Sequence, residues 1–366
     1  MMAELQSAHR GCLLGLAVGD AMGYAVDSKS WAEIQEDYGP NGLLGYDLVN
    51  GYADVTSYTQ IAAFAANGLL FGITRGQIRG RMAPLVRYIE VAVREWSRSQ
   101  HYCEPKQNYC WLSTVPELKR RRCMDTWMLS ILSREKLGTM EEPVNRSANP
   151  AAITEAIPVA LLMQDLNLTA EERDRLSAEA VALTHGSPMA FLPGAIIAYL
   201  LGRVLRKPEI PLQTLIEESM EAFDDQFGRE YAQAADILAL MKQAIAMSRD
   251  WRAKPVEAME KLKCETGAQV LAGAVYAALV GQHDFDTAMI AAVNHSGRSA
   301  AVGAVAGAIL GARLGEDALP EFYIECLEPA EVLRELADDL YDGCPMEMGS
   351  KLFDLDWDYK YLHGGQ

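Results

Sequence analysis

Three short polar segments interrupt otherwise apolar stretches of this 366-residue chain, and their residue types could support chemistry. They span residues 15–27, 54–60 and 294–303, and each adjoins a stretch that is typical of a buried helix. Carboxylates can transfer protons, while hydroxyl and guanidinium groups can hold an anionic ligand. The candidate site residues in these segments are Asp27, Asp54, Thr56, Ser57, Tyr58, His295, Arg298 and Ser299.

Arg298 stands out because the first turn of a helix disfavours a cation. An arginine at a buried helix start therefore needs an anionic partner, which is either a carboxylate of the chain or a ligand phosphate. Within the chain we expect that partner to be Asp27 or Asp54. Both carboxylates also have ordinary structural interpretations, because Asp27 follows a helix end and Asp54 precedes a Ser/Thr helix cap.

Two further polar residues lie in apolar surroundings. His185 is placed between a threonine and a Gly-Ser-Pro step, where a hydrogen-bonded structural histidine is more common than a catalyst. Glu155 lies inside an apolar helix and needs a partner, because burying an unpaired carboxylate is costly. Arg298 or Arg146 could supply that partner. As a group, Asp27, Asp54 and Glu155 are the candidate catalytic acids or bases.

Composition narrows the class of protein. The chain has 33 Lys and Arg against 50 Asp and Glu, which gives a net charge of −17. This charge excludes a protein that binds nucleic acid or an anionic membrane through its overall charge. The seven cysteines are odd in number and lack a zinc-type spacing, which favours reduced thiols in a cytoplasmic protein. The apolar stretches are expected to be too short or too interrupted for a membrane span.

Helical periodicity dominates the chain, and small residues fill many of the apolar positions. Small side chains allow helices to approach closely, which favours a single compact all-α domain over residues 1–345. Residues 346–366 form an aromatic and acidic tail that docks on the body or on a second subunit. Helices are predicted at residues 7–18, 59–71, 82–97, 126–133, 153–164, 189–205, 211–223, 231–247, 267–280, 285–294, 300–314 and 329–341.

Taken in order, these segments resemble the ADP-ribosylglycohydrolase family, and the resemblance runs from about residue 11 to residue 320. It implies an orthogonal multi-helix fold. The segments follow the family's Gly-Asp-Ala-Leu-Gly loop, its Ser/Thr-Asp-Asp-Thr-Gln motif, its Asn-x-Ser-x-Gly…Met-Arg-x-x-Pro segment, its Thr-His-Gly-His-Pro segment and its His-Ser-Gly-Asp-Ser-Asp-Ser-Thr-Gly motif. The matching residues are 15–27, 55–60, 145–161, 184–188 and 295–303.

The departures from the family pattern concern its metal site. The resemblance implies two Mg²⁺ ions, held by carboxylates and hydroxyls, that position a water for attack on a ribosyl bond. Here four metal-binding aspartates and one hydroxyl residue are replaced, which removes four negative charges and adds one positive charge. Mg²⁺ prefers carboxylate-rich oxygen sites, so we expect no metal and no family-type catalysis. The replacing residues are Ser57, Tyr58, Arg298, Ala300 and Ala301.

Three functions are compatible with this pattern. The first is a pseudoenzyme that binds an ADP-ribose-like or other anionic small molecule, or a modified protein, through a set of ligand-binding residues. These residues are Asp27, Thr56, Ser57, Tyr58, His185, His295, Arg298 and Ser299. The second is a metal-independent hydrolase of an N- or O-glycosidic, ADP-ribosyl-type bond, in which the candidate carboxylates act as acid or base. The third is a structural or interaction protein with a filled cleft. The acidic surface and the tail permit a homodimer without establishing one.

Overall fold

Two antiparallel helices, α1 (Met2–Tyr24) and α15 (Ser299–Leu314), approach so closely at the centre of the molecule that their backbones touch. Glycines repeat every four residues along both helices and face each other in pairs, so no side chain separates the two backbones. A Cβ atom built on Gly19 would lie 1.9 Å from the Gly303 carbonyl oxygen, and one on Gly307 would lie 1.9 Å from that of Gly15. The close approach expected from the small residues is therefore present.

The computed structural model describes residues 2–101, 108–123, 125–162, 168–349 and 353–365. These residues form helices and turns, with two isolated β-bridges. The remaining α-helices are α2 (Trp31–Tyr38), α3 (Ser57–Arg79), α4 (Leu85–Ser99), α5 (Pro116–Lys119), α6 (Thr126–Leu132), α7 (Ile157–Leu161), α8 (Ala170–Ala182), α9 (Pro188–Arg206), α10 (Leu212–Phe227), α11 (Ala234–Ser248), α12 (Pro255–Leu262), α13 (Gly267–Val280), α14 (Phe285–Val293), α16 (Glu321–Glu325), α17 (Ala330–Asp342) and α18 (Leu355–Tyr361). Short 3₁₀ helices occur at Trp111–Thr114, Ile153–Ala156 and Glu316–Ala318.

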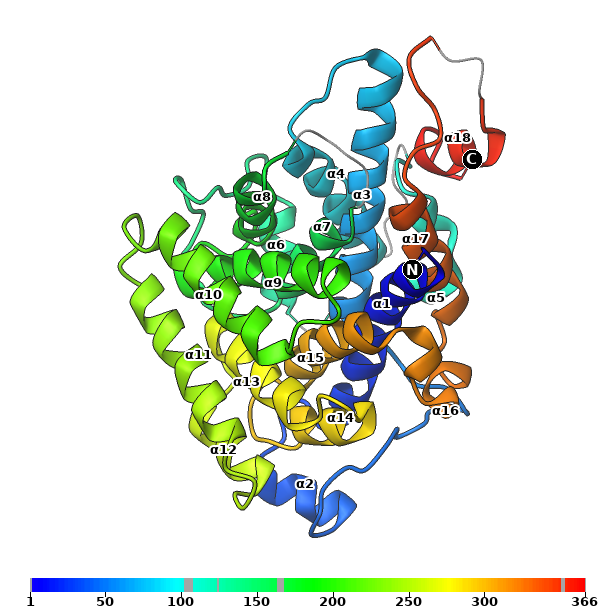
Figure 1. Cartoon of the computed structure of the whole chain (residues 1–366). Helices are drawn as coiled ribbons and strands as arrows, with labels where there is room; N and C mark the ends of the chain where they lie inside the picture. The colour runs from blue at the N-terminus through cyan, green and yellow to red at the C-terminus, as the bar shows by residue number, and fades with distance from the viewer. Residues whose placement is uncertain (1, 102–107, 124, 163–167, 350–352, 366) are drawn as a thin grey trace.

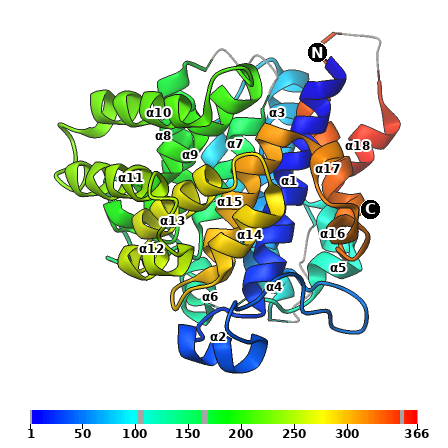
Figure 2. The same cartoon turned by 60° about the horizontal axis from the view of Figure 1, so that its bottom comes forward.

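The other helices surround this central pair in one all-α domain. The apolar helices α9, α13 and α14 pack against α15, and α3 packs with α4 on another side (Figure 1). Helices α10 to α12 form one edge of the molecule, and α2 lies at the end opposite α18 (Figures 1 and 2). The predicted all-α architecture is confirmed.

Helix α9 (Pro188–Arg206) has the length and apolarity of a membrane span, contrary to the expectation that no segment is long enough. It continues through Pro193, which was expected to interrupt it. Of its most apolar stretch 78% is buried, which is the pattern of a core helix.

The predicted helices correspond to observed ones, with two kinds of difference. The segment predicted as one helix over residues 153–164 is a 3₁₀ turn followed by α7, and its last two residues lie outside the described part of the chain. Short or strongly polar helices were missed, including α2, α8 and α12. The tail docks on the body: Trp357 Nε1 donates to Thr74 Oγ1 at 2.9 Å, and the Tyr361 hydroxyl bonds Asp339.

Candidate functional site

The start of helix α3 is held by Asp20, a buried carboxylate of α1. Its oxygens accept hydrogen bonds from the amide and hydroxyl of Thr56, at 2.9 and 2.6 Å. The amide and hydroxyl of Thr59 donate to it at 3.0 and 2.6 Å. Burial raises the pKa of Asp20 to about 6 against these bonds. The sequence did not predict this role, although a single aspartate in an apolar helix was a signal for it.

The remaining amides at the start of α3 also have partners. The Thr56 hydroxyl accepts from the Tyr58 amide at 3.2 Å, and the Ser57 amide donates to the carbonyl of Arg122 at 3.2 Å. The side chains of Thr56, Ser57 and Tyr58 are all buried. Burial raises the pKa of the Tyr58 hydroxyl well above its usual value, and the nearby charge of Asp27 adds to that rise. These backbone amides at the start of α3 are therefore already hydrogen-bonded by other residues of the chain.

At the start of α15 the corresponding carboxylate is Asp27. Its Oδ1 atom accepts from the backbone amide of Ala300 at 3.0 Å, which favours an anion at the positive end of the helix. Burial raises the pKa of Asp27, while the Ala300 amide and the charge of Arg298 oppose the rise. Asp27 therefore lies within the electrostatic reach of Arg298.

The expected ion pair of Arg298 with Asp27 or Asp54 is not the one formed. The Arg298 Nε atom instead lies 3.6 Å from Glu265 Oε2, and the two side chains are 35% and 56% exposed. Asp54 is already paired with Arg122, at 2.7 Å. The backbone amide of Arg298 donates to the Cys264 carbonyl at 2.9 Å, and this bond places Arg298 beside the loop that carries Glu265.

Both candidate histidines are buried. In His295 the Nδ1 atom accepts from the Gly297 amide at 2.9 Å, so Nε2 carries the proton and donates to the Ala292 carbonyl at 3.0 Å. These bonds give His295 a role in shaping the loop before α15. His185 bonds the Thr184 hydroxyl through Nδ1 at 2.8 Å, while Nε2 has no hydrogen-bond partner in the described chain. Burial lowers the pKa of each histidine to about 4.

Glu155 is fully buried beside the start of α3. Neither carboxylate oxygen has a hydrogen-bond partner among the described residues, so the expected pairing with Arg298 or Arg146 is absent there. Burial raises the pKa of Glu155 well above its usual value, because it disfavours the charged form of the carboxyl. The neighbouring Thr154 hydroxyl bonds the Tyr58 carbonyl at 2.7 Å and links this turn to α3.

Most of the predicted site residues are buried, and solvent reaches only part of the set. Asp27, Asp54 and Arg298 are partly exposed. The buried members are Thr56, Ser57, Tyr58, Glu155, His185, His295 and Ser299. Ala300 and Ala301, at the start of α15, are also buried and carry no ligating side chain. Of the predicted set, only Asp27, Asp54 and Arg298 are therefore within direct reach of a ligand in solvent.

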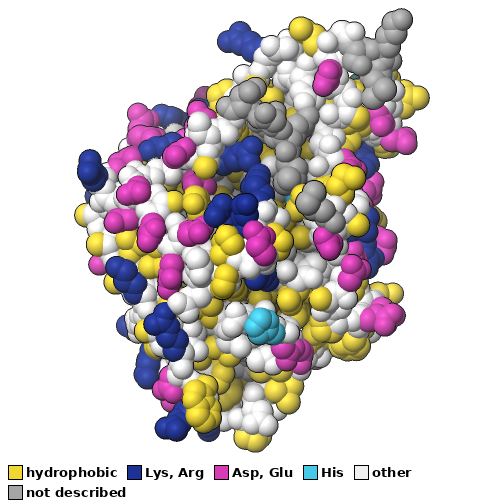
Figure 3. Space-filling view, viewed as in Figure 1, with side chains coloured by type: hydrophobic (Ala, Val, Ile, Leu, Met, Phe, Trp, Pro, Cys, Tyr) yellow, Lys and Arg dark blue, Asp and Glu magenta, His cyan; other side chains and the backbone are white. Residues whose placement is uncertain are grey.

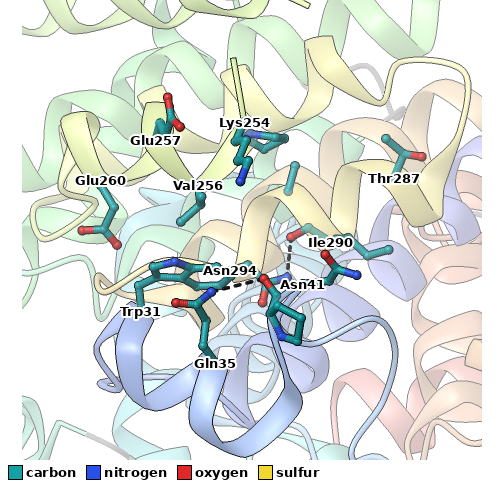
Figure 4. A pocket seen from close by; sticks show the side chains of 13 residues that line it. Trp31, Gln35, Asn41, Lys254, Val256, Glu257, Glu260, Thr287, Ile290 and Asn294 are labelled. Atoms are coloured by element: carbon teal, nitrogen blue, oxygen red, sulfur yellow. Dashed lines mark hydrogen bonds between the residues drawn. The ribbon is translucent and has the colours of Figure 1, made fainter. Parts of the chain in front are cut away.

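A groove of about 670 Å³ lies beside the third polar segment and was not predicted. Trp31 and Gln35 of α2 face Val256 of α12 across it (Figure 4). Ser296 connects the groove to the segment, because its hydroxyl accepts from the Trp31 amide at 2.9 Å and donates to Glu260 at 2.8 Å. The groove is formed by helices far apart in sequence, so no local pattern indicated it.

Comparison with known proteins gives a consistent result over the whole chain. The sequence model of the family described as ADP-ribosylglycohydrolase matches residues 1–348. An uncharacterized protein of Archaeoglobus fulgidus is 25% identical over 362 residues, which cover 92% of this chain and 97% of that protein. A solved structure described as an ADP-ribosylglycohydrolase-related protein complex superposes with a TM-score of 0.58 at 23% identity, covering 93% of this chain and 99% of that one. The last likeness concerns the fold.

Proposed function

Since the chain belongs to the ADP-ribosylglycohydrolase family, we propose that it is a non-hydrolytic member that binds an anionic, ADP-ribose-like group without Mg²⁺. The observation that carries the proposal is the donor set at the starts of α3 and α15. Positions where the family has metal-binding carboxylates hold Ser57, Tyr58, Arg298 and Ala300. Of the nearby carboxylates, Asp20, Asp27 and Asp54 have other partners, whereas Glu155 is buried without one among the described residues.

Those commitments argue against a metal site. Asp20 accepts four hydrogen bonds from α3, Asp27 accepts the Ala300 amide, and Asp54 pairs with Arg122. Mg²⁺ would have to displace these partners and then lie near the guanidinium of Arg298, which repels it in a partly dry site. Among the described residues no group of three or more His, Cys, Asp or Glu side chains is placed to hold one ion. The residues present do not fit the family's metal pair.

Arg298 is the group best placed to meet an anion. Its only ion-pair partner in the described chain, Glu265, is 56% exposed and 3.6 Å away, and such exposed pairs contribute about 0–1 kcal/mol. A phosphate that accepts two guanidinium N–H bonds is a stronger partner than this one. The adjoining groove of Trp31 offers an apolar wall for a ring of the same ligand.

The direct test is calorimetric titration of the chelator-treated full chain with ADP-ribose, in the presence and absence of Mg²⁺. We expect the same affinity in both conditions and a loss of about tenfold in Arg298→Ala. Arg249→Ala is the matched control, because Arg249 is 62% exposed and pairs only with Glu217 among the described residues, at 3.7 Å. Binding that requires Mg²⁺ would overturn the proposal and restore metal-dependent hydrolysis as the leading function.

Restoring the carboxylates tests the assignment of the replaced positions. The quadruple variant Ser57→Asp, Tyr58→Asp, Arg298→Asp and Ala300→Asp should gain measurable Mg²⁺ affinity, because it returns four anionic oxygen donors to the two helix starts. The matched control carries Asn at the same four positions, which keeps the side-chain shape without the charge. A folded Asp variant that binds Mg²⁺ no better than the Asn variant would show that these positions do not correspond to the metal site.

Two alternatives retain some support. The raised pKa of Asp27 suits a metal-independent acid or base, and release of ADP-ribose from an ADP-ribosylated protein in excess chelator would favour that hydrolase. The burial of Ser57 and Tyr58 suits a filled cleft with an interaction role, and absence of ADP-ribose binding in both titrations would favour it.

A further inference from the structure

A second pocket, of about 290 Å³ and with several charged lining residues, lies at the C-terminal half of α9, between α7 and α8. Its lining contains none of the predicted site residues and none of the residues that line the groove beside α2. A group of Lys and Arg side chains lies near the middle of the face shown in Figure 3, with acidic side chains around it. The lining residues that matter here are Arg173, Asp174, Tyr199, Gly202, Arg203 and Arg206.

Two of the three arginines have no carboxylate at salt-bridge distance in the described chain, although the charge of Asp174 acts on Arg173. Arg203 is paired with Glu218, at 2.7 Å. The Nε atom of Arg173 is shielded from solvent without a hydrogen-bond partner, and Arg206 donates to the carbonyl of Gly202 at 3.0 Å. Burial lowers the pKa of Arg206, and the charge of Arg173 lowers it further, so the two guanidinium groups lie within reach of each other.

Two like charges that share a partly buried pocket are unfavourable unless an anion joins them. Guanidinium groups bind phosphate oxygens through pairs of parallel N–H bonds, and a chain with a net charge of −17 has no general affinity for anions. The pocket volume suits a small group rather than a whole nucleotide. From this geometry we propose that the pocket is a binding site for a small phosphate-class anion, held between Arg173 and Arg206.

Asp174 lines the same pocket, and its negative charge should oppose the binding of an anion there. Arg173, Arg203, Arg206 and Tyr199 line the pocket with Asp174, and the charges that act on the Asp174 carboxyl are those of Glu171 and Arg173. Burial and the charge of Glu171 raise the pKa of Asp174 to about 7, and Arg173 opposes the rise. An ionised Asp174 would compete with the ligand for the arginines, so Asp174→Asn should bind the anion more tightly.

The test is calorimetric titration of the full chain with inorganic phosphate and with pyrophosphate, at low salt and about pH 7.5. We expect wild-type binding that weakens by about thirtyfold or more in Arg173→Gln/Arg206→Gln, because both bidentate contacts are lost. The matched control, Arg175→Gln/Arg249→Gln, removes the same charge from arginines that are paired with Glu141, Glu230 and Glu217, and should change the affinity by less than about twofold.

Gly202→Asp provides a second variant if the double substitution does not fold. A Cβ atom at this position points to within 3.0 Å of the Arg206 Nη1 atom, so the new carboxylate would occupy the guanidinium and exclude the anion. In an Arg298→Ala background, Arg173→Gln/Arg206→Gln should cause the same loss of phosphate affinity as in wild type, which separates this site from the proposed ADP-ribose site at Arg298. The inference is overturned if wild type binds neither probe at about 10 mM, or if the control pair loses as much affinity as the Arg173/Arg206 pair.

Discussion

The interface between α1 and α15 and the polar helix starts beside it involve the same two helices, yet they depend on side chains in opposite ways. Along the interface the backbones touch through facing glycines, and any side chain larger than hydrogen would collide. At the helix starts, by contrast, Asp20 and Asp27 hold backbone amides that any residue type could present. One region is defined by the absence of side chains and the other by their chemistry.

This difference separates what the family fold requires from what the family reaction requires. The glycine pairs fix where α15 begins relative to Asp27, whatever residue occupies position 298. Arginine at that position alters the charge of the site without altering the packing of the two helices. A chain can therefore belong to the family by its fold while its helix starts carry different chemistry, which is the basis of the proposed function.

The largest effect is expected from breaking the glycine interface. In Gly307→Ala the new Cβ would lie 1.9 Å from the Gly15 carbonyl oxygen, a backbone atom that cannot rotate away. We expect a loss of at least about 4 kcal/mol in the free energy of unfolding, measured by urea denaturation, or failure to fold. Gly202→Ala is the helical control, since its Cβ would meet only the end of the Arg206 side chain. Equal stability of the two variants would show that the backbones do not touch.

A smaller loss is expected from the polar side of the comparison. Asp20→Ala leaves two amides and two hydroxyls of Thr56 and Thr59 without their buried acceptor, which should cost about 3 kcal/mol. Asp37→Ala removes an exposed carboxylate paired with Lys29 and should cost less than about 1 kcal/mol. If the same denaturation measurement gives similar losses for both variants, Asp20 does not hold the start of α3.

The two regions also differ in how far the sequence reveals them. Helical periodicity and the run of small residues predict α15 within one residue and predict its close packing, because spacing alone determines both. Helix α8 was missed because its first half is charged, although Thr169 and Glu172 form a capping box that marks its start. Arg173 and Asp174, the basis of the second proposed site, lie on that missed helix.

The partners of site side chains could not be predicted in the same way. Arg298 was expected to meet an aspartate of another polar segment, and instead it meets Glu265 of a loop that tertiary packing brings alongside. Asp20 lay in a segment singled out for chemistry, but its four bonds to α3 depend on the contact between two helices. A sequence pattern identifies which groups need partners, whereas the packing of distant segments decides which partners they receive.

The smallest effect concerns the pH dependence of stability. A change in pH should act through the buried histidine His185 and not through the glycine interface. His185 has a pKa of about 4 in the folded chain, because burial disfavours its charged form, against about 6.5 when unfolded. Between these values the unfolded chain binds more protons, so the stability that neutral His185 contributes is present above about pH 6.5 and is lost as pH falls. Wild type should lose about 2 kcal/mol more stability between about pH 7 and pH 5 than His185→Gln does.

The control is His283→Gln, at an exposed position, which should keep the wild-type pH dependence. Gly307→Ala, if folded, should lower the free energy of unfolding equally at both pH values. A wild-type slope in His185→Gln would contradict the burial of this side chain.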